Sequence, residues 1–146
     1  MRRRGASSEK GRRATAVYLF YRSGEPLVAL ASGRKLPIEA ENLHDLLSVV
    51  GNFVETSMPG SRGYAVTAMT YEEFGIVAVR GEFVIGAALY TRPADEGLKA
   101  NLLRAVRDIE DRHWRDLSSW ADATRVAKVA EDEMSKLLEI PSVRHP

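Results

Sequence analysis

The chain of 146 residues contains no cysteine, which excludes disulfide bonds and thiolate chemistry. No apolar run approaches the ~20 residues of a membrane-spanning helix. The longest candidate, residues 77–90, is interrupted by Arg80 and Glu82. The basic residues near the start are not followed by an apolar stretch as long as that of a signal peptide. These absences favour a cytoplasmic location, and a peripheral position at a membrane surface is the alternative.

Sequence motifs of common enzyme classes are also missing. The glycine-containing segment 59–63 lacks the G-x-x-x-x-G-K-[ST] pattern of a phosphate-binding loop, and it follows a predicted helix rather than a strand. No G-x-S-x-G pattern is present, so a serine hydrolase of the nucleophile-elbow type is not supported. The sequence therefore predicts a protein that is not an enzyme and that binds no cofactor.

The histidines and carboxylates do not combine into a predicted metal site. His113 lies near Asp111 and Asp116 on a predicted helix, but two kinds of ligand on one helix do not complete a coordination sphere. We expect His113 and His44 to be half-buried structural residues. We also expect the clustered acidic side chains to be solvated, namely Glu72, Glu73, Asp108, Glu110 and Asp111.

Charge is distributed unevenly along the chain. Residues 1–13 contain six basic residues and one acidic residue, a charge of +5 (6 − 1), so the remainder carries −4 (1 − 5). We predict that 1–13 is a disordered basic tail, with the remnant of a linker to an upstream domain as the alternative. Binding of this tail to nucleic acid or an anionic membrane is the less favoured interpretation, because no aromatic residues are patterned beside it. Residues 141–146 are expected to form a short C-terminal tail.

Strands are predicted where β-branched and aromatic residues are concentrated, at 14–22, 27–32, 64–70, 74–80 and 83–91. The first, fourth and fifth of these are apolar on both faces, which predicts central strands, because such a strand is covered on both sides. The second begins beside Pro26, and the third contains Thr67 and Thr70, so these two are expected at the edges. The hairpin-length connections between the last three predict a mainly antiparallel sheet.

Helices are predicted where apolar residues recur at three- and four-residue spacing, at 38–57, about 95–120 and about 122–140. Gly51 lies inside the first helix and costs about 1 kcal/mol there relative to alanine, so we interpret it as a point of close backbone approach. Gly75 and Gly86 are interpreted as room for a helix on the sheet. The predicted fold is α+β, a three-layer α/β/α sandwich of order β-β-α-β-β-β-α-α, in one domain over 14–140.

Three segments carry a resemblance to a known group of proteins. They are the opening hairpin AVYLFYRSGEPLVAL, the helix LHDLLSVVGNFVETSM and the hairpin FGIVAVRGEFVIGAALY. In this element order they resemble the longin and roadblock group of profilin-like domains, most closely the short prokaryotic, in particular archaeal, longin-like domains. The resemblance implies a non-catalytic interaction module that forms dimers and serves as a platform for a small GTPase or a membrane-associated complex. It implies no particular site residues.

Candidate interface residues follow from the predicted elements. Sheet edges and the first helix are the expected surfaces for a homodimer, because unpaired edge strands must be covered or paired. Tryptophans near the junction of the last two helices are expected to pack between helices, and an exposed one would instead indicate a binding hot spot. The candidates are Leu43, Leu47, Gly51, Val66, Ala68, Trp114 and Trp120.

The alternative function is small-molecule sensing by a PAS-like or profilin-like domain of a signalling protein. A five-stranded antiparallel sheet can hold a small molecule against a helix, in an apolar pocket with a few convergent polar groups. The residues that would contribute are Tyr18, Tyr21, Thr67 and Tyr90.

Overall fold

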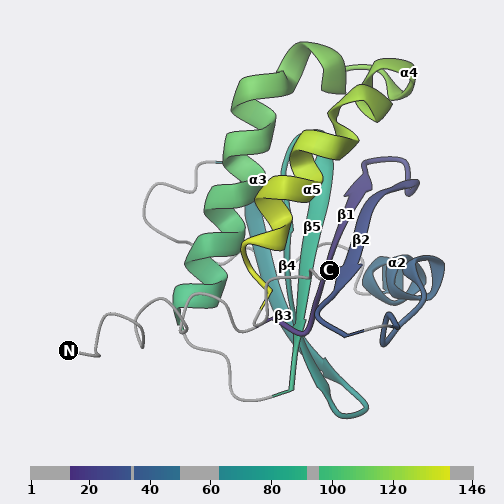
Figure 1. The fold of residues 1–146 in the computed structure, drawn as a ribbon, viewed down its shortest axis with the longest axis vertical. Helices are drawn as coiled ribbons and strands as arrows, with labels where there is room; N and C mark the ends of the chain where they lie inside the picture. The colour runs from purple at the N-terminus through teal and green to yellow at the C-terminus, as the bar shows by residue number, and fades with distance from the viewer. Residues whose placement is uncertain (1–13, 34, 50–62, 92–95, 139–146) are drawn as a thin grey trace.

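The computed structural model describes residues 14–33, 35–49, 63–91 and 96–138, shown in colour in Figure 1. The strands are β1 (Ala16–Tyr21), β2 (Pro26–Ala31), β3 (Ala65–Tyr71), β4 (Phe74–Arg80) and β5 (Val84–Tyr90). The helices are α2 (Ala40–Val49), α3 (Glu96–Leu117), α4 (Trp120–Ala123), the 3-10 turn η1 (Thr124–Val126) and α5 (Ala127–Ser135).

The five strands form one sheet in the order β2-β1-β5-β4-β3, and every neighbouring pair is antiparallel. The predicted α+β fold with a five-stranded antiparallel sheet is therefore confirmed. The predicted placement of the strands is also confirmed, since β1, β5 and β4 are central and β2 and β3 are the edges. All six residues of β1 are buried, as expected for a strand with two apolar faces.

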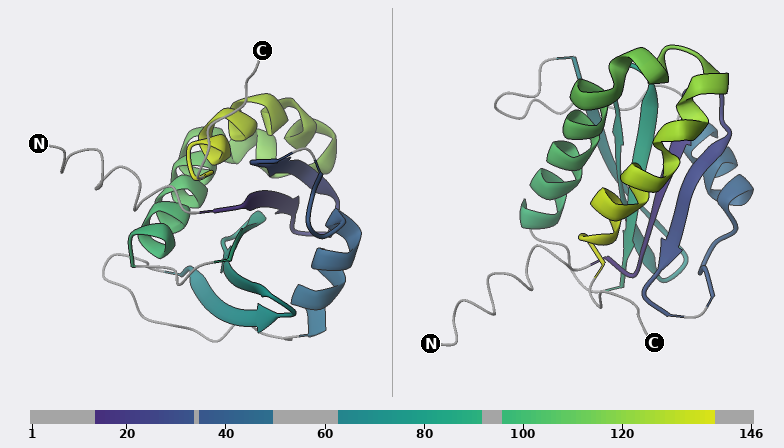
Figure 2. Two further views of the ribbon diagram at one scale, coloured as in Figure 1. Left: turned by 60° about the horizontal axis from the view of Figure 1, so that its bottom comes forward. Right: turned by 45° about the horizontal axis from the view of Figure 1, so that its top comes forward.

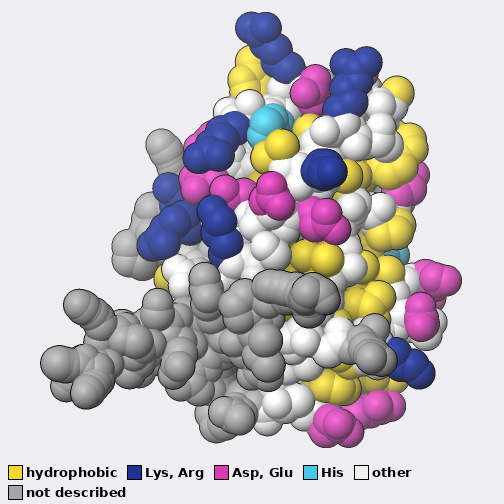
Figure 3. Space-filling model, in the orientation of Figure 1, with side chains coloured by type: hydrophobic (Ala, Val, Ile, Leu, Met, Phe, Trp, Pro, Cys, Tyr) yellow, Lys and Arg dark blue, Asp and Glu magenta, His cyan; other side chains and the backbone are white. Residues whose placement is uncertain are grey.

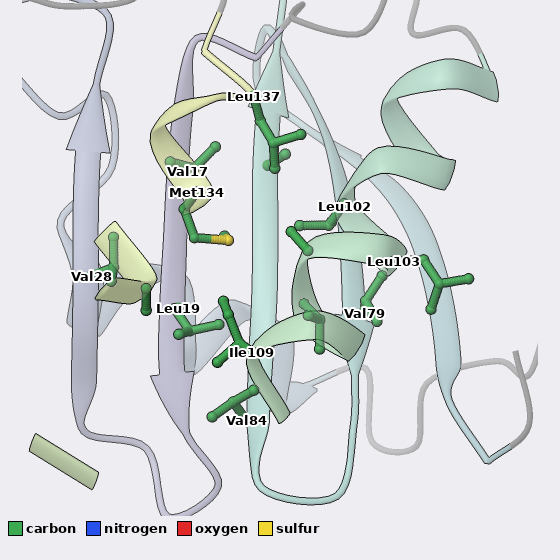
Figure 4. Packing of buried hydrophobic residues seen from close by; sticks show 14 of the residues in the cluster. Val17, Leu19, Val28, Val79, Val84, Leu102, Leu103, Ile109, Met134 and Leu137 are labelled. Carbon is green, nitrogen blue, oxygen red and sulfur yellow. The ribbon is translucent and has the colours of Figure 1, made fainter. Parts of the chain in front are cut away.

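Side chains alternate between the two faces of the sheet and pack into two separate apolar clusters. Val17 and Leu19 of β1 join the cluster beneath α3 and α5, which Figure 4 shows from close by. Tyr18 and Phe20 join the cluster on the opposite face, together with Leu43 of α2. The helices thus lie on both sides of the sheet, as the two views in Figure 2 show.

Two tyrosines of β1 tie the sheet to the segments on either face. The Tyr18 hydroxyl donates a hydrogen bond to the carbonyl oxygen of Ile38, just before α2, at 2.5 Å. The Tyr21 hydroxyl donates to the carbonyl oxygen of Leu117, the last residue of α3, at 2.8 Å. Both bonds are buried, so each satisfies a polar group that would otherwise be costly to bury.

The predicted role of two glycines is confirmed at one and wrong at the other. A Cβ at Gly86 would lie 2.7 Å from Cγ2 of Val106, so this glycine does let α3 approach the sheet. At Gly75 the space is taken by the ring of Tyr90 from the neighbouring strand, and not by a helix.

The last predicted helix, at 122–140, is wrong in its extent. The chain breaks after Leu117, restarts at Trp120 with the Ser119 side chain accepting from the Asp122 N–H, and continues through η1 into α5, which ends at Ser135. The physical reason lies at the C-terminal end, where Leu138 makes a parallel bridge to Ala14 and so cannot be helical. Of the first predicted helix, the part at 50–57 lies outside the described residues.

Candidate interaction surfaces

Within the described residues, the edge strand β3 shows no register shift, charged residue or proline. Its register with β4 runs without a shift from Ala65 opposite Arg80 to Tyr71 opposite Phe74. The strand AVTAMTY has no charged residue and no proline, whereas natural edge strands are commonly guarded by charges, prolines or bulges. Ala68, at its centre, is exposed. Val66 is 1% exposed, so it belongs to the core rather than to this surface.

The edge formed by β2 is guarded in two ways. Its register with β1 shifts between Leu19 and Phe20, and the strand begins with Pro26, which has no N–H to donate. Both α5 and α2 also pack against this strand. The structure therefore separates two edges that the sequence analysis treated as equivalent.

A shallow groove continues the β3 edge onto α2. It has a volume of about 290 Å³ and is lined by Ile38, Asn42, Asp45, Leu46 and Tyr71. Tyr71 is the last residue of β3, so the groove and the edge form one continuous surface. Its floor is apolar, and Asn42 and Asp45 add polar groups from exposed positions of α2.

Leu43 and Leu47 of the first helix, which were predicted to be interface residues, are not at the surface. Leu43 and Leu47 are 0% and 2% exposed, because they point into the core between α2 and the sheet. Of the leucines of α2, Leu46 rather than Leu43 or Leu47 lines the groove at the surface. Gly51 lies outside the described residues.

A second surface lies at the end of the molecule where α4 meets the β1–β2 turn, near the top of Figure 1. The guanidinium of Arg22 lies over the ring of Tyr21 at 5.6 Å and over that of Phe83 at 5.4 Å. The Trp120 ring packs against Tyr21 at 5.4 Å and is still 37% exposed. We call Arg22, Phe83 and Trp120, with buried Tyr21 beneath them, the arginine–aromatic surface.

Trp114 and Arg115 are at the same end of the molecule, in the last turn of α3. Trp114 is 55% exposed, so the expectation that it packs between helices is wrong, and Arg115 lies over its ring at 5.3 Å. The preceding His113 has non-helical torsions (φ −127°, ψ 25°), so the helix axis kinks just before these residues. In Figure 3, cationic and apolar side chains lie together at this end.

Beneath the arginine–aromatic surface, Glu110 of α3 holds the β4–β5 turn. Its Oε2 accepts the N–H of Phe83 at 2.7 Å and that of Val84 at 3.1 Å. Its Oε1 accepts the Tyr64 hydroxyl at 2.7 Å and the Glu82 N–H at 3.2 Å. Glu110 is only 5% exposed, so the prediction that it is solvated is wrong. A buried carboxylate is tolerated here because four donors replace its hydration.

The turn is built around this carboxylate. A Cβ at Gly81 would lie 2.5 Å from Oε2 of Glu110, so only glycine leaves room for it. Burial raises the pKa of Tyr64 above its ordinary value, and the hydrogen bond and negative charge of Glu110 raise it further. The Arg22 N–H donates to the Phe83 carbonyl oxygen at 2.8 Å, which links the clamped turn to the β1–β2 turn.

The four residues predicted to line a ligand pocket do not converge. Tyr18 and Thr67 lie on the face covered by α2, whereas Tyr21 and Tyr90 pack on the face covered by α3. The sheet separates the two pairs, so they cannot line one pocket. Another depression, of about 270 Å³ between α3 and α5, contains none of them.

The predicted structural histidines are half-buried, as expected. His44 packs against the Phe20 ring, with centroids 5.6 Å apart. Over the described ranges, no three histidine or acidic side chains gather closely enough to hold a metal ion. In the same part of the chain, no helix has the length and apolar character needed to cross a membrane.

Comparison with known proteins finds likeness only at the level of solved structures. No protein-family model matches the chain, and no curated protein matches it in sequence. Among solved structures, the chain is similar to one described as "MglB with tetrameric arrangement", with 13% sequence identity and a TM-score of 0.43. The match covers 91% of this chain and 86% of that chain. At this level of similarity, residues of the two proteins cannot be equated.

Proposed function

We propose that this protein is a non-catalytic interaction module that self-associates through the β3 edge and presents a platform to a protein partner. The observation that carries the proposal is the regular β3 strand, which has no charge or proline and has exposed Ala68 at its centre. The backbone N–H and C=O groups along an edge strand can pair with another strand. The β2 edge is interrupted by its register shift and by Pro26, so we expect self-association to stop at a closed pair rather than extend into a fibre.

The shape of the proposed dimer follows from the strand itself. A two-fold axis at the middle of β3 pairs two copies antiparallel, with Ala68 opposite Ala68 of the second copy. A strand pair alone buries too little surface for a stable dimer, which typically needs about 1,200–2,000 Å². The groove between Leu46 and Tyr71 supplies further apolar area beside the strand.

The class of partner rests on a different argument. A small GTPase is the partner implied by the resemblance of the two hairpins and the first helix to longin and roadblock domains, and a membrane-associated complex is the alternative. The proposal therefore has two separable parts, which are self-association and the identity of the partner.

The first part is tested by the solution mass of the full chain, measured by light scattering over a concentration series. A mass near twice 16.2 kDa supports the proposal, and a strict monomer at high concentration overturns it. The second part is tested with a panel of small GTPases loaded with GDP or with a GTP analogue. Binding that depends on the nucleotide supports the assignment, and no binding across the panel removes it.

A further inference from the structure

Two aromatic rings hold the guanidinium of Arg22 in place. It is exposed, and its Cζ lies over the rings of Tyr21 and Phe83, 5.6 Å and 5.4 Å from their centroids. Among the residues that the structure describes, no carboxylate lies within ion-pair distance of it. A guanidinium held by cation–π contacts can still bind a carboxylate through two parallel hydrogen bonds from its N–H donors.

The support beneath this arginine is rigid. The Tyr21 hydroxyl is bonded to the Leu117 carbonyl oxygen, so the ring that forms the floor is fixed to the end of α3. The Phe83 backbone is fixed by Glu110 on one side and by the Arg22 N–H on the other. A surface that is ordered before binding loses less conformational entropy when a partner is bound.

The surroundings favour a single carboxylate over a polyanion. Glu25 lies on the β1–β2 turn with Arg22, and its carboxylate accepts the Ser23 hydroxyl; exposed Glu82 lies on the neighbouring β4–β5 turn. Within these two turns Arg22 is the one cation beside two carboxylates. A membrane surface or a nucleic acid would bring several negative charges against those carboxylates, whereas a peptide can bring one.

We propose that the arginine–aromatic surface binds an extended segment of a protein partner in which an acidic side chain pairs with Arg22. An apolar side chain next to it in the partner packs on Trp120. Tryptophan, tyrosine and arginine are the residue types enriched at binding hot spots. The arginine–aromatic surface is distinct from the β3 edge of the proposed function, because it lies at the end of the sheet where β3 begins. The inference holds whether or not the partner is a small GTPase.

The test selects a phage-displayed random peptide library on the immobilised full chain and measures binding of the enriched peptides by fluorescence anisotropy. We expect enriched sequences with one acidic residue beside an apolar one. Arg22→Gln should weaken binding roughly tenfold or more, as should Trp120→Ala. Arg22→Lys should also weaken it, because lysine keeps the charge but not the planar donor pair.

The matched control is Arg112→Gln, which removes the same charge from an exposed arginine of α3 and should change binding less than about twofold. Arg22 is exposed, so its variants keep the fold, and unchanged thermal unfolding verifies this. Three outcomes would overturn the inference. They are a selection without acidic peptides, peptides that bind Arg22→Gln as well as the parent chain, and Arg22-dependent binding only to vesicles containing phosphatidylglycerol.

Discussion

The two edge strands of the sheet differ in regularity and in sequence. At β2 the register shifts between Leu19 and Phe20, the strand starts with Pro26, and α5 and α2 pack against it. At β3 the register is continuous, the strand has no charge or proline, and Ala68 is exposed. At the start of β3, the Tyr64 hydroxyl donates a hydrogen bond to the Glu110 carboxylate of α3. The comparison shows that equal position in a sheet does not mean equal availability for pairing.

Removing the Glu110 carboxylate, which holds the β4–β5 turn and the residue before β3, should have the largest effect on stability. Glu110→Ala leaves three backbone N–H groups and the Tyr64 hydroxyl without their acceptor. We expect the free energy of unfolding to fall by about 3–5 kcal/mol, because each unsatisfied buried donor costs about 1–3 kcal/mol and water can reach some of them. Urea denaturation measures this. Asp111→Ala, at the exposed neighbouring carboxylate, should stay within about 0.5 kcal/mol, and an equal loss in both variants would contradict the account.

High pH should lower the free energy of unfolding through Tyr18, which lies on the face of the sheet covered by α2. Tyr18 lies across from Ala29 of β2, and its hydroxyl bonds to the Ile38 carbonyl oxygen. Burial, with a smaller contribution from the charge of Glu39, raises the pKa of Tyr18 to about 12 despite the opposing effect of the hydrogen bond to Ile38. The folded-state value exceeds the unfolded value of about 10, so this contribution is complete below pH 10 and is lost as pH rises towards 12. The loss should reach about 3 kcal/mol.

The check is the free energy of unfolding from pH 8 to pH 12, followed by circular dichroism. Tyr18→Phe removes the titrating group, so its stability should decline less over this range than that of the parent chain. Equal declines in the two proteins would show that Tyr18 is not responsible.

A smaller effect is expected from Tyr64→Phe, which keeps Glu110 and its three backbone donors but removes the hydroxyl that ties β3 to α3. The loss should be about 1.5–3 kcal/mol, the usual value for a hydrogen bond to a charged group. It should be smaller than the loss in Glu110→Ala. Amide hydrogen exchange should rise in β3 and not in β2, and a rise in both strands would contradict the difference between the edges.

The smallest effect is expected at the guarded edge. Pro26→Lys adds a charge at the exposed first residue of β2 and should change stability by no more than about 0.5 kcal/mol. It should leave the solution mass unchanged, since β2 is not the pairing edge. A loss of self-association in this variant would assign the interface to β2 instead.

Much of the sheet could be predicted from the sequence because its signals are local. Strands that are apolar on both faces are central, and those with a proline or with polar residues are at the edges. The end of α5 could not be predicted, because it is set by the bridge between Leu138 and Ala14, which are far apart in the chain. Local helical spacing contains no information about such a contact.

The surroundings of Glu110 and Arg22 were harder to predict, because they too depend on contacts between residues far apart in the chain. Glu110 continues the spacing of buried Leu103 and Val106, so its place on the inner face of α3 was readable from the sequence. Its partners were not, because the turn that it holds precedes it by 26 to 28 residues. The contact of the Arg22 guanidinium with the rings of Tyr21 and Phe83 likewise depends on the antiparallel pairing of β1 with β5.

The most direct test of pairing through the β3 edge introduces charges of opposite sign at Ala68 in two separate variants. The solution mass of each variant and of their mixture is measured by light scattering. Ala68→Lys and Ala68→Glu each place like charges opposite one another across the proposed two-fold axis, where such a juxtaposition costs several kcal/mol. Each variant alone should be monomeric, and an equimolar mixture should recover a mass near twice 16.2 kDa. If both variants remain dimeric alone, or the mixture stays monomeric, β3 does not pair with itself about Ala68.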